Sequence, residues 1–532
     1  MPHPPQFLLP LRASWSGARR MRRLRSPGRE LAAQARHAGA LRAAYARTAY
    51  GRENGIEAGM GDQAWRERVP LRLHQDLAPY LERMLRGESD VLWPGRCDYF
   101  SGSAGLTGDY AKCLPVTAAL LAHYRRAGED ALHCYTARTG RTSVFGGKHL
   151  LLGGAVALDA LRARRARPTG LGDLGALTAL HLPGWAARAL AEPGEAIARL
   201  DDWTAKIDAA ARRCASLDVR LLAGTPDRVL ELAAAVLAHS AQARGGRRPS
   251  HLREIWPRLE CLVHSGVPVA PFAASLRAHC GSSVRFHEIY CASEAVIAAQ
   301  DAEPEAGLRL LADTGVHFEF LPLADYDESR LAHLSGRAVP LEGVKPGIDY
   351  ALVLSTPAGL ARYVLGDVVR FVSTTPARLH YVGRLRLLLN AFGEAILEKE
   401  LTDAVTEVCR RHAWQVVNFH VAPLFTSDSL TGRPRGGHEW WIELQPGTIE
   451  TPTGPALAAE LDQELQRLHP GYREKRRTAQ LPAPTVRLVM PGVFERWQRE
   501  TGPWGGQRKI PRSRSDRQIA DALARHAPFH DA

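Results

Sequence analysis

The chain has 532 residues, of which 45% are hydrophobic and 23% are charged. This length exceeds one ordinary domain, so we expect two or three compact units, and the composition excludes a disordered chain. The formal charge of +13, from 69 Lys and Arg against 56 Asp and Glu, is spread along the chain. Because basic and aromatic residues do not interleave, a nucleic-acid binder ranks last among the functions we consider, and we expect no nucleic acid as partner.

The patterns of metal-stabilised and membrane proteins are missing from the sequence. The eight cysteines are scattered without a Cys-x-x-Cys pair, which argues against structural zinc and a disulfide framework. The most apolar run begins at His149, is short and carries Asp159, whereas a membrane span needs roughly 18–20 apolar residues. We therefore expect no membrane partner and a cytoplasmic location, while the oligomeric state stays open.

Residues 1–36 form a basic extension in which Glu30 is the only acidic residue. Their composition resembles an organelle transit segment, but the apolar run is too short for a secretory core. A start placed too far upstream, with Met21 as the true first residue, explains the segment equally well. We expect this extension to be disordered or to result from such a start.

Helices and short apolar strands alternate after this extension. Residues 30–46 and 73–86 have helical spacing of apolar residues. Residues 145–245 are predicted to be mostly helical, but the apolar run VRLLAG at 219–224 is typical of a buried parallel strand. CLVHSG at 261–266 repeats that pattern. Strands that alternate with helices indicate an α/β fold.

The stretch FSGSAGLTGDYAKCLPVT at residues 100–117 is rich in Gly and Ser. Such a backbone can bring N–H groups and hydroxyls close to an anion, and a nearby Lys balances charge on phosphate. The pattern is not that of a P-loop, and a mobile surface loop is the alternative. We expect Pro115 to end the regular element and a helix to follow, whose start helps to hold the anion. The candidate phosphate-binding residues are Ser103, Gly105, Thr107, Gly108 and Lys112.

A second candidate lies in SSVRFHEIYCASEAVIAAQD at residues 282–301. VRFHEIY is predicted to be a strand, with Tyr290, Ser293 and Glu294 at its end. Ligands bind at the carboxyl ends of strands in open α/β sheets, so these side chains could meet a nucleotide and its Mg ion. The alternative is a turn in which Ser caps a helix and Glu lies in its first turn.

A third candidate is Asp367. Residues 315–323 alternate as a strand, and two more strands, joined through Pro357 and Gly359, are predicted within residues 351–373. We expect Asp367 in a turn between apolar runs. Asp is a common turn residue, but a fixed carboxylate could also accept both ribose hydroxyls of a nucleotide.

The pattern changes near residues 384–390, where we place a domain boundary. A helix from Glu398, two strands separated by the turn GRPRGGH, a helix, a strand and a helix follow. This alternation predicts a small α+β unit with its own core. Beyond it, Lys509 lies between Gly506 and Pro511. A Lys on such a segment can reach into another domain's cleft, although exposure to solvent is commoner for Lys.

In chain order, six motifs resemble those of the acyl acid amido synthetase family, which is known from auxin-responsive plant proteins and many bacteria and belongs to the adenylate-forming superfamily. The motifs are SAGLTGDYAK, YCASE, HFEFLP, GLARYVLGD, the GR and FGE of the hinge, and GGQRKIPR. The resemblance implies these roles: Ser103, Gly105, Thr107, Gly108 and Lys112 at the phosphates, Tyr290 and Ser293 along the adenine, Asp367 on the ribose, Arg384 near the nucleotide, Glu294 at Mg, and Lys509 as the catalytic Lys of the mobile domain.

The chain departs from the family pattern at several positions. Ala104 replaces a Ser and Leu106 replaces a Thr, so two hydroxyls that face phosphate are missing. Ala361 stands where an aromatic residue is often found, and Ala395 or its neighbours do not supply a Lys that plant members carry after the hinge. A degenerate, noncatalytic member that binds nucleotide is therefore one alternative.

The resemblance also implies the architecture and the reaction. It implies an α/β fold with a large, multi-layered N-terminal adenylate-forming domain at residues 37–384 and a smaller, mobile α+β C-terminal domain at residues 385–532. The implied enzyme is a ligase that uses ATP and Mg to adenylate a carboxylic acid, releases pyrophosphate, and transfers the acyl group to an amine, which we expect to be an amino acid. A ligase that forms an acyl-CoA or carrier thioester is the nearer alternative. The sequence identifies neither the acid nor the amine.

Overall fold

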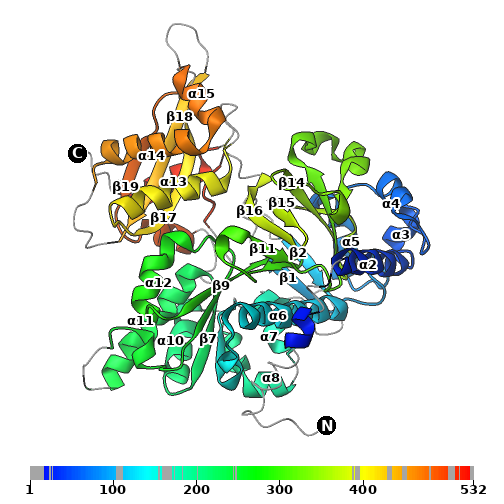
Figure 1. Cartoon of the computed structure of the whole chain (residues 1–532), viewed down its shortest axis with the longest axis horizontal. Helices are drawn as coiled ribbons and strands as arrows, with labels where there is room; N and C mark the ends of the chain where they lie inside the picture. Colours follow the sequence, from blue (N-terminus) through cyan, green and yellow to red (C-terminus); the bar gives the residue numbers. More distant parts are fainter. Residues whose placement is uncertain are drawn as a thin grey trace. The chain divides into compact units, whose positions relative to one another are not determined.

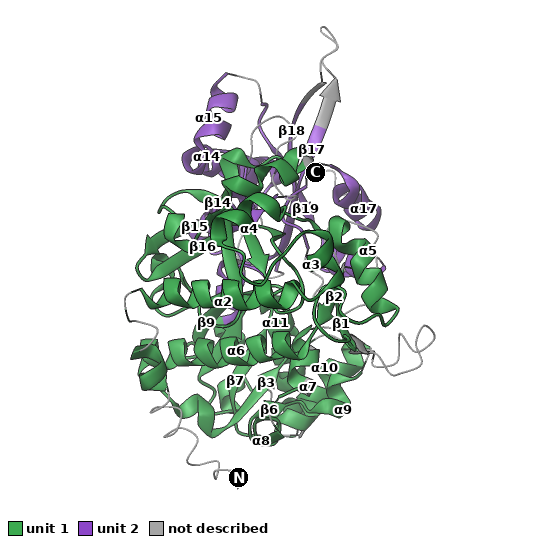
Figure 2. Ribbon diagram, turned by 90° about the vertical axis from the view of Figure 1, so that its right-hand side faces the viewer, with its two compact units in different colours: residues 1–266, 277–381, 505–507 green, residues 267–276, 382–504, 508–532 purple. Residues whose placement is uncertain are grey.

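The chain divides into two compact units, which Figure 2 shows in green and purple. Unit 1 holds residues 1–266, 277–381 and 505–507, and unit 2 holds residues 267–276, 382–504 and 508–532. The computed structural model describes residues 17–22, 26, 28–103, 112–153, 156–157, 170–172, 174–182, 184–200, 202–243, 245, 249–385, 389, 396–427, 434–445, 452–478, 481–500, 510–514 and 516–527.

A long mixed sheet forms the centre of unit 1 (Figure 1). Strands β6, β3, β7, β8 and β9 pair in parallel, and β10 and β11 continue the sheet antiparallel. The strand order is β13-β12-β14-β15-β16-β11-β10-β9-β8-β7-β3-β6. The bounds are β3 (Lys148–Leu151), β6 (Ala191–Glu192), β7 (Val219–Gly224), β8 (Cys261–His264), β9 (Arg285–Cys291), β10 (Val296–Ala299), β11 (Leu308–Leu310), β12 (His317–Pro322), β13 (Val339–Pro340), β14 (Asp349–Ser355), β15 (Tyr363–Thr374) and β16 (Ala377–Arg384).

A second, smaller sheet of unit 1 has the order β2-β1-β5-β4. Its strands are β1 (Tyr99–Ser103), β2 (Lys112–Val116), β4 (Val156–Ala157) and β5 (Gly170–Gly172). The helices that accompany the two sheets are α2 (Arg29–Tyr45), α3 (Ala49–Glu53), α4 (Asp62–Arg68), α5 (His74–Leu85), α6 (Ala118–Thr139), α7 (Leu174–Leu180), α8 (Gly184–Ala189), α9 (Glu195–Ala198), α10 (Trp203–Cys214) and α11 (Pro226–Ala243), while α12 (Ala273–Cys280) crosses the limit between the units.

The local sequence determines where helix α6, which contacts the candidate site, begins and ends. Thr117 caps its start, because the Thr117 side chain accepts a hydrogen bond from the Leu120 amide at 3.0 Å. Gly140 ends it in a left-handed conformation with φ of 68°. Between these ends, Tyr135 packs on Leu221 and Val263 of the parallel strands.

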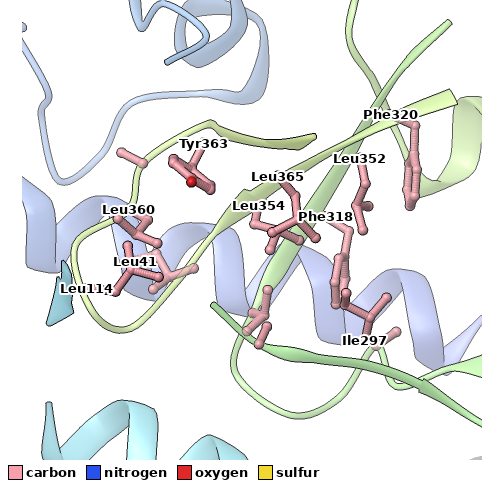
Figure 3. Packing of buried hydrophobic residues seen from close by; sticks show 14 of the residues in the cluster. Leu41, Leu114, Ile297, Phe318, Phe320, Leu352, Leu354, Leu360, Tyr363 and Leu365 are labelled. Carbon is pink, nitrogen blue, oxygen red and sulfur yellow. The ribbon is translucent and has the colours of Figure 1, made fainter. Parts of the chain in front are cut away.

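The largest apolar cluster of unit 1 lies under the antiparallel strands. Phe318 and Phe320 of β12 stand opposite Leu354 and Leu352 of β14 in the strand register. Figure 3 shows these four side chains together in the packed interior. These large apolar residues therefore pack together on one face of the two strands, although both faces of β12 and β14 are buried.

A buried ion pair between Arg362 and Glu319 connects β12 with neighbouring segments of unit 1. The Arg362 side chain is fully buried, and its Nε and Nη2 donate to the two carboxylate oxygens of Glu319 at 3.0 and 2.9 Å. Its remaining N–H groups donate to the carbonyl oxygens of Arg66, Val69 and Ser335. All five guanidinium donors are thus used, which offsets the cost of burying the charge.

Unit 2 is a three-stranded sheet with helices on both faces. The strand order is β17 (Val416–Ser427), β18 (Pro434–Leu444) and β19 (Thr485–Val489). Trp440 belongs to the apolar cluster that includes residues of α13 (Glu398–Arg411), α14 (Gly454–Leu468) and α15 (Pro470–Arg477). The next residue, Trp441, points to the other face, against α16 (Val493–Glu500) and α17 (Gln518–His526).

Most expected elements are present, and two expectations are wrong. Residues 145–245 are mostly helical where the structure describes them, as expected, although short strands such as β3 and β6 also lie there. Pro115 does not end an element but lies inside β2, which is tolerated because β2 is an edge strand. Residues 434–438 of the expected turn GRPRGGH belong to β18, while the rest of that turn lies outside the described residues. The sequence also did not predict α17.

Part of the expected N-terminal extension belongs to unit 1. Residues 17–22 are helical, and Arg20 forms ion pairs with Asp130 at 2.7 Å and Asp313 at 3.1 Å. Residues 29–36 belong to α2. These residues are therefore not a disordered extension, while residues 1–16 lie outside the described part of the chain.

Replacing Arg362 with Met should lower the free energy of unfolding of unit 1 by about 3–5 kcal/mol, because the Glu319 carboxylate would stay buried without its partner. The matched control is Arg370→Met, since Arg370 makes a two-fold contact with Asp349 on the exposed surface and such pairs contribute at most about 1 kcal/mol. Chemical denaturation measures both. Equal losses in the two variants would contradict the role of the Arg362–Glu319 pair.

Buried histidines should make the protein sensitive to mild acid. Burial lowers the pKa of His149 and His420 to about 4 and that of His287 to about 3, from the usual 6.5. Because the folded state favours the neutral imidazole, this contribution to stability is complete above pH 6.5 and is lost as the pH falls toward 4. The free energy of unfolding measured by urea denaturation should therefore fall from pH 7 to pH 5. The fall should be smaller in His287→Asn than in the wild type. A flat profile over this range would contradict the expectation.

Candidate functional site

Two of the sequence motifs meet at a hydrogen bond between Tyr290 of β9 and Asp367 of β15. The Tyr290 hydroxyl donates to Asp367 Oδ2 at 2.7 Å, and both residues are buried. The Tyr290 ring also lies edge-on to the ring of Tyr381, with centroids 5.5 Å apart. Residues 77 positions apart in the chain, both expected at a nucleotide, are thus direct neighbours.

This contact requires a strongly curved sheet. Three strands, β16, β11 and β10, lie between β15 and β9 in the strand order. In a flat sheet four strand spacings would separate the two residues by about 19 Å. Only a sheet that twists and curls can bring the Tyr290 hydroxyl to the Asp367 carboxylate.

Asp367 owes its direction to a bulge in β15. It lies in a strand rather than in the expected turn, because the pairing partners jump from Ala351–Val368 to Val353–Val364. Gly366 adopts a positive φ of 90° there, a conformation that suits Gly. An added Cβ would meet nothing within 4 Å, so a side chain at 366 would be disfavoured by the backbone alone. Such a bulge can re-aim the next side chain.

Ser293 and Glu294 form the tip of a hairpin between β9 and β10. The expected alternative, a helix that starts at these residues, is wrong, because β10 returns antiparallel to β9. The Ala292 amide donates to the Ala295 carbonyl at 2.9 Å across the tip. Glu294 is only 5% exposed, whereas Ser293 is half-buried. The hairpin thus holds a carboxylate inside the protein a few residues from Tyr290.

The Gly-rich stretch connects two antiparallel strands. Ser103 of β1 is paired with Lys112 of β2, so residues 104–111 join the ends of one hairpin. A helix follows the stretch as expected, because α6 begins at Ala118, directly after residues 100–117, and β2 lies within the stretch itself. Gly105, Thr107 and Gly108 lie outside the described residues.

The two remaining candidates belong to other parts of the chain. Arg384 is the last residue of β16 and falls in unit 2, because the limit between the units lies after Tyr381. Lys509 lies outside the described residues. The contact of Tyr381 with Tyr290 and the pairing of Glu319 with Arg362 were missed, because the sequence shows the residues but not which strands approach each other.

The donor chemistry of the site fits Mg. Among the described residues no group of three or more His, Cys, Asp or Glu could hold a metal ion by itself. Mg is commonly held by one or two carboxylates together with nucleotide phosphates and water. The buried Glu294 carboxylate offers such a hard oxygen ligand, so the residues present are compatible with an ion that arrives with a nucleotide.

The part of the chain described by the structure contains no helix long and apolar enough to span a membrane. None of its eight cysteines forms a disulfide bond.

The chain is similar in sequence to known amido synthetases. Curated relatives include a probable indole-3-acetic acid-amido synthetase, GH3.12 from Oryza sativa subsp. japonica, which is 29% identical over 270 residues, covering 45% of this chain and 44% of that protein. Jasmonoyl-L-amino acid synthetase JAR4 from Nicotiana attenuata is 32% identical over 158 residues, covering 28% of this chain and 26% of that protein. The chain spans less than half the length of these relatives.

Solved structures share the fold across nearly the whole chain. The GH3.15 acyl acid amido synthetase superposes with a TM-score of 0.74 at 17% identity, covering 99% of this chain and 98% of that one. A 2-hydroxyisobutyryl-CoA ligase superposes with a TM-score of 0.56 at 14% identity, covering 94% and 92%. These matches confirm the expected α/β fold with a large N-terminal and a smaller C-terminal part.

Three family models account for most of the sequence. The N-terminal, central and C-terminal domains of the GH3 family match residues 32–285, 309–384 and 399–518, respectively. Together with the shared fold and the order of the motifs, these matches show that the chain belongs to the GH3 family.

Proposed function

We propose that this chain is an ATP-dependent acyl acid amido synthetase, which joins a small carboxylic acid to an amine through an acyl-adenylate. The observation that carries the proposal is the 2.7 Å hydrogen bond between Tyr290 and Asp367. It unites two motifs expected at the base and the ribose of one nucleotide. The family membership supports the same reaction class.

The chemistry follows from the weak electrophilicity of a carboxylate. Attack of the acid on the α-phosphorus of ATP forms acyl-AMP and releases pyrophosphate, and an amine then attacks the acyl carbonyl and expels AMP. Charge that builds on the phosphates must be offset by cations and N–H donors. In this proposal the groups that do so are Ser103, Gly105, Thr107, Gly108, Lys112 and Lys509, with Arg384 near the nucleotide.

The nucleotide itself would lie along Tyr290 and Ser293. In this proposal Asp367, whose Oδ2 accepts a hydrogen bond from the Tyr290 hydroxyl, would accept both ribose hydroxyls. Glu294 would hold Mg, which when bound offsets negative charge on the phosphates. The acid and the acceptor are proposed by analogy with relatives named for indole-3-acetic acid and for jasmonoyl-L-amino acid, so we expect an amino acid as acceptor. A cytoplasmic location stays a prediction.

A pyrophosphate-release screen over carboxylic acids and amino acids tests the proposal. At least one pair should give pyrophosphate release that depends on ATP and forms an amide, and Lys112→Ala and Asp367→Ala should abolish it. Amide formation with no thioester when CoA replaces the amine would separate this enzyme from a thioester-forming ligase. ATP binding without turnover across the whole panel would contradict the proposal and favour a noncatalytic member.

Removing the Tyr290 hydroxyl should weaken ATP binding about tenfold, because the loss of one hydrogen bond to a carboxylate costs roughly 1.5 kcal/mol and frees Asp367 to turn away. Isothermal titration of Tyr290→Phe with ATP measures this. The matched control is Tyr80→Phe, since the Tyr80 hydroxyl also donates to a carboxylate, that of Glu53, but on the exposed surface. Unchanged ATP affinity in Tyr290→Phe would contradict the expected role.

A further inference from the structure

Two consecutive residues of α6 hold both sides of the hairpin tip that carries Glu294. The Tyr124 hydroxyl donates to the carbonyl oxygen of Ala292, just before the tip. His123 Nε2 accepts a hydrogen bond from the Val296 amide at 3.0 Å, just after the tip. All of these residues belong to unit 1. The tip is therefore tied at its entry and its exit to the same turn of one helix.

His123 is itself fixed. Its Nδ1 lies 3.1 Å from the carbonyl oxygen of Thr314. Because a carbonyl only accepts, Nδ1 must carry the proton, which leaves Nε2 as the acceptor that the Val296 amide requires. The imidazole is 1% exposed and lies edge-on to the Tyr124 ring, with centroids 5.3 Å apart. Both ring nitrogens thus have a partner, and the ring cannot turn without breaking a bond.

The helix that carries His123 and Tyr124 is firmly placed. Ala127 and Ala131, on the following turns of α6, pack against Val296 and Ala299 of β10 and against Leu311, which directly follows β11. Small residues there let the helix approach the strands closely. The helix also begins directly after β2, the strand that contains Lys112. One helix therefore links the strand that contains Lys112 to the hairpin that carries the buried Glu294 carboxylate.

We propose that His123 and Tyr124 are positioning residues, which hold the Ser293–Glu294 tip so that the Glu294 carboxylate is ready to receive Mg together with ATP. The proposal rests on the proposed function, in which Glu294 is the carboxylate for Mg. It adds two residues that touch neither nucleotide nor metal. Groups that orient a metal ligand commonly change metal affinity when they are removed.

The test compares substitutions that remove single contacts. Tyr124→Phe removes only the hydroxyl that holds Ala292. His123→Asn can still donate to Thr314 but is too short to accept from Val296, whereas the longer His123→Gln can accept from the Val296 amide. The control is Tyr135→Phe, which removes another buried hydroxyl of α6, one that donates to Glu260 at 2.8 Å away from the hairpin.

Two measurements on the full-length protein report on the tip and on the metal. Hydrogen exchange without nucleotide should show faster exchange of residues 291–296 in Tyr124→Phe and His123→Asn. Isothermal titration of ATP at several Mg concentrations should show that these variants need about tenfold more Mg for half-maximal ATP binding. His123→Gln should recover most of the wild-type behaviour, and Tyr135→Phe should match wild type in both measurements.

The possible failures are distinguishable. If wild type binds ATP with Mg dependence and both Tyr124→Phe and His123→Asn keep the same Mg requirement, the positioning role is overturned while the proposed function stands. If wild type itself shows no Mg dependence, the role of Glu294 in the proposed function fails, and this inference fails with it.

Discussion

The buried pair of Arg362 and Glu319 is the interaction on which the placement of the site depends. A charged pair in an apolar core is tolerated only when nearly every donor and acceptor is satisfied, and here the guanidinium uses all five of its N–H groups. It binds β12, the α4 region and the segment that ends at Arg337 to the start of β15. Arg362 holds a left-handed φ of 49°, a conformation that costs energy in a non-Gly residue and persists because these contacts fix it.

The strand that begins next to this ion pair, β15, also contains Asp367 of the candidate site. The Arg362 carbonyl accepts from the Arg72 amide at 3.0 Å, and the Val364 amide donates to the Arg72 carbonyl at 2.8 Å. The beginning of β15 is thereby fixed on both sides of Tyr363. A few residues on, the bulge at Gly366 aims Asp367 toward Tyr290. The hairpin beyond Tyr290 is tied to α6, so the buried carboxylates of Asp367 and Glu294 are both held by contacts that precede any ligand.

The sequence predicted the family from the order of its motifs. It predicted the α/β fold and most strands because apolar runs such as VRLLAG and alternating runs such as HFEFLP are visible in the local sequence. It could not show that Ser293 and Glu294 sit in a hairpin, since Ser and Glu also suit a helix start and only the pairing of β9 with β10 decides between them. The bulge at Asp367 depends on register with β14 in the same way. The partners of Glu319 and Tyr290 come from distant segments, so no local pattern could reveal them.

The most direct test of a shared nucleotide site is a double-mutant cycle on ATP affinity with Tyr290→Phe, Asp367→Asn and the combined variant. If Tyr290 acts by orienting Asp367, we expect the combined loss to be close to that of Asp367→Asn alone, with a coupling energy of about 1 kcal/mol or more. Losses that simply add would show that the two side chains act independently, and would contradict the claim that these motifs form one site for ATP.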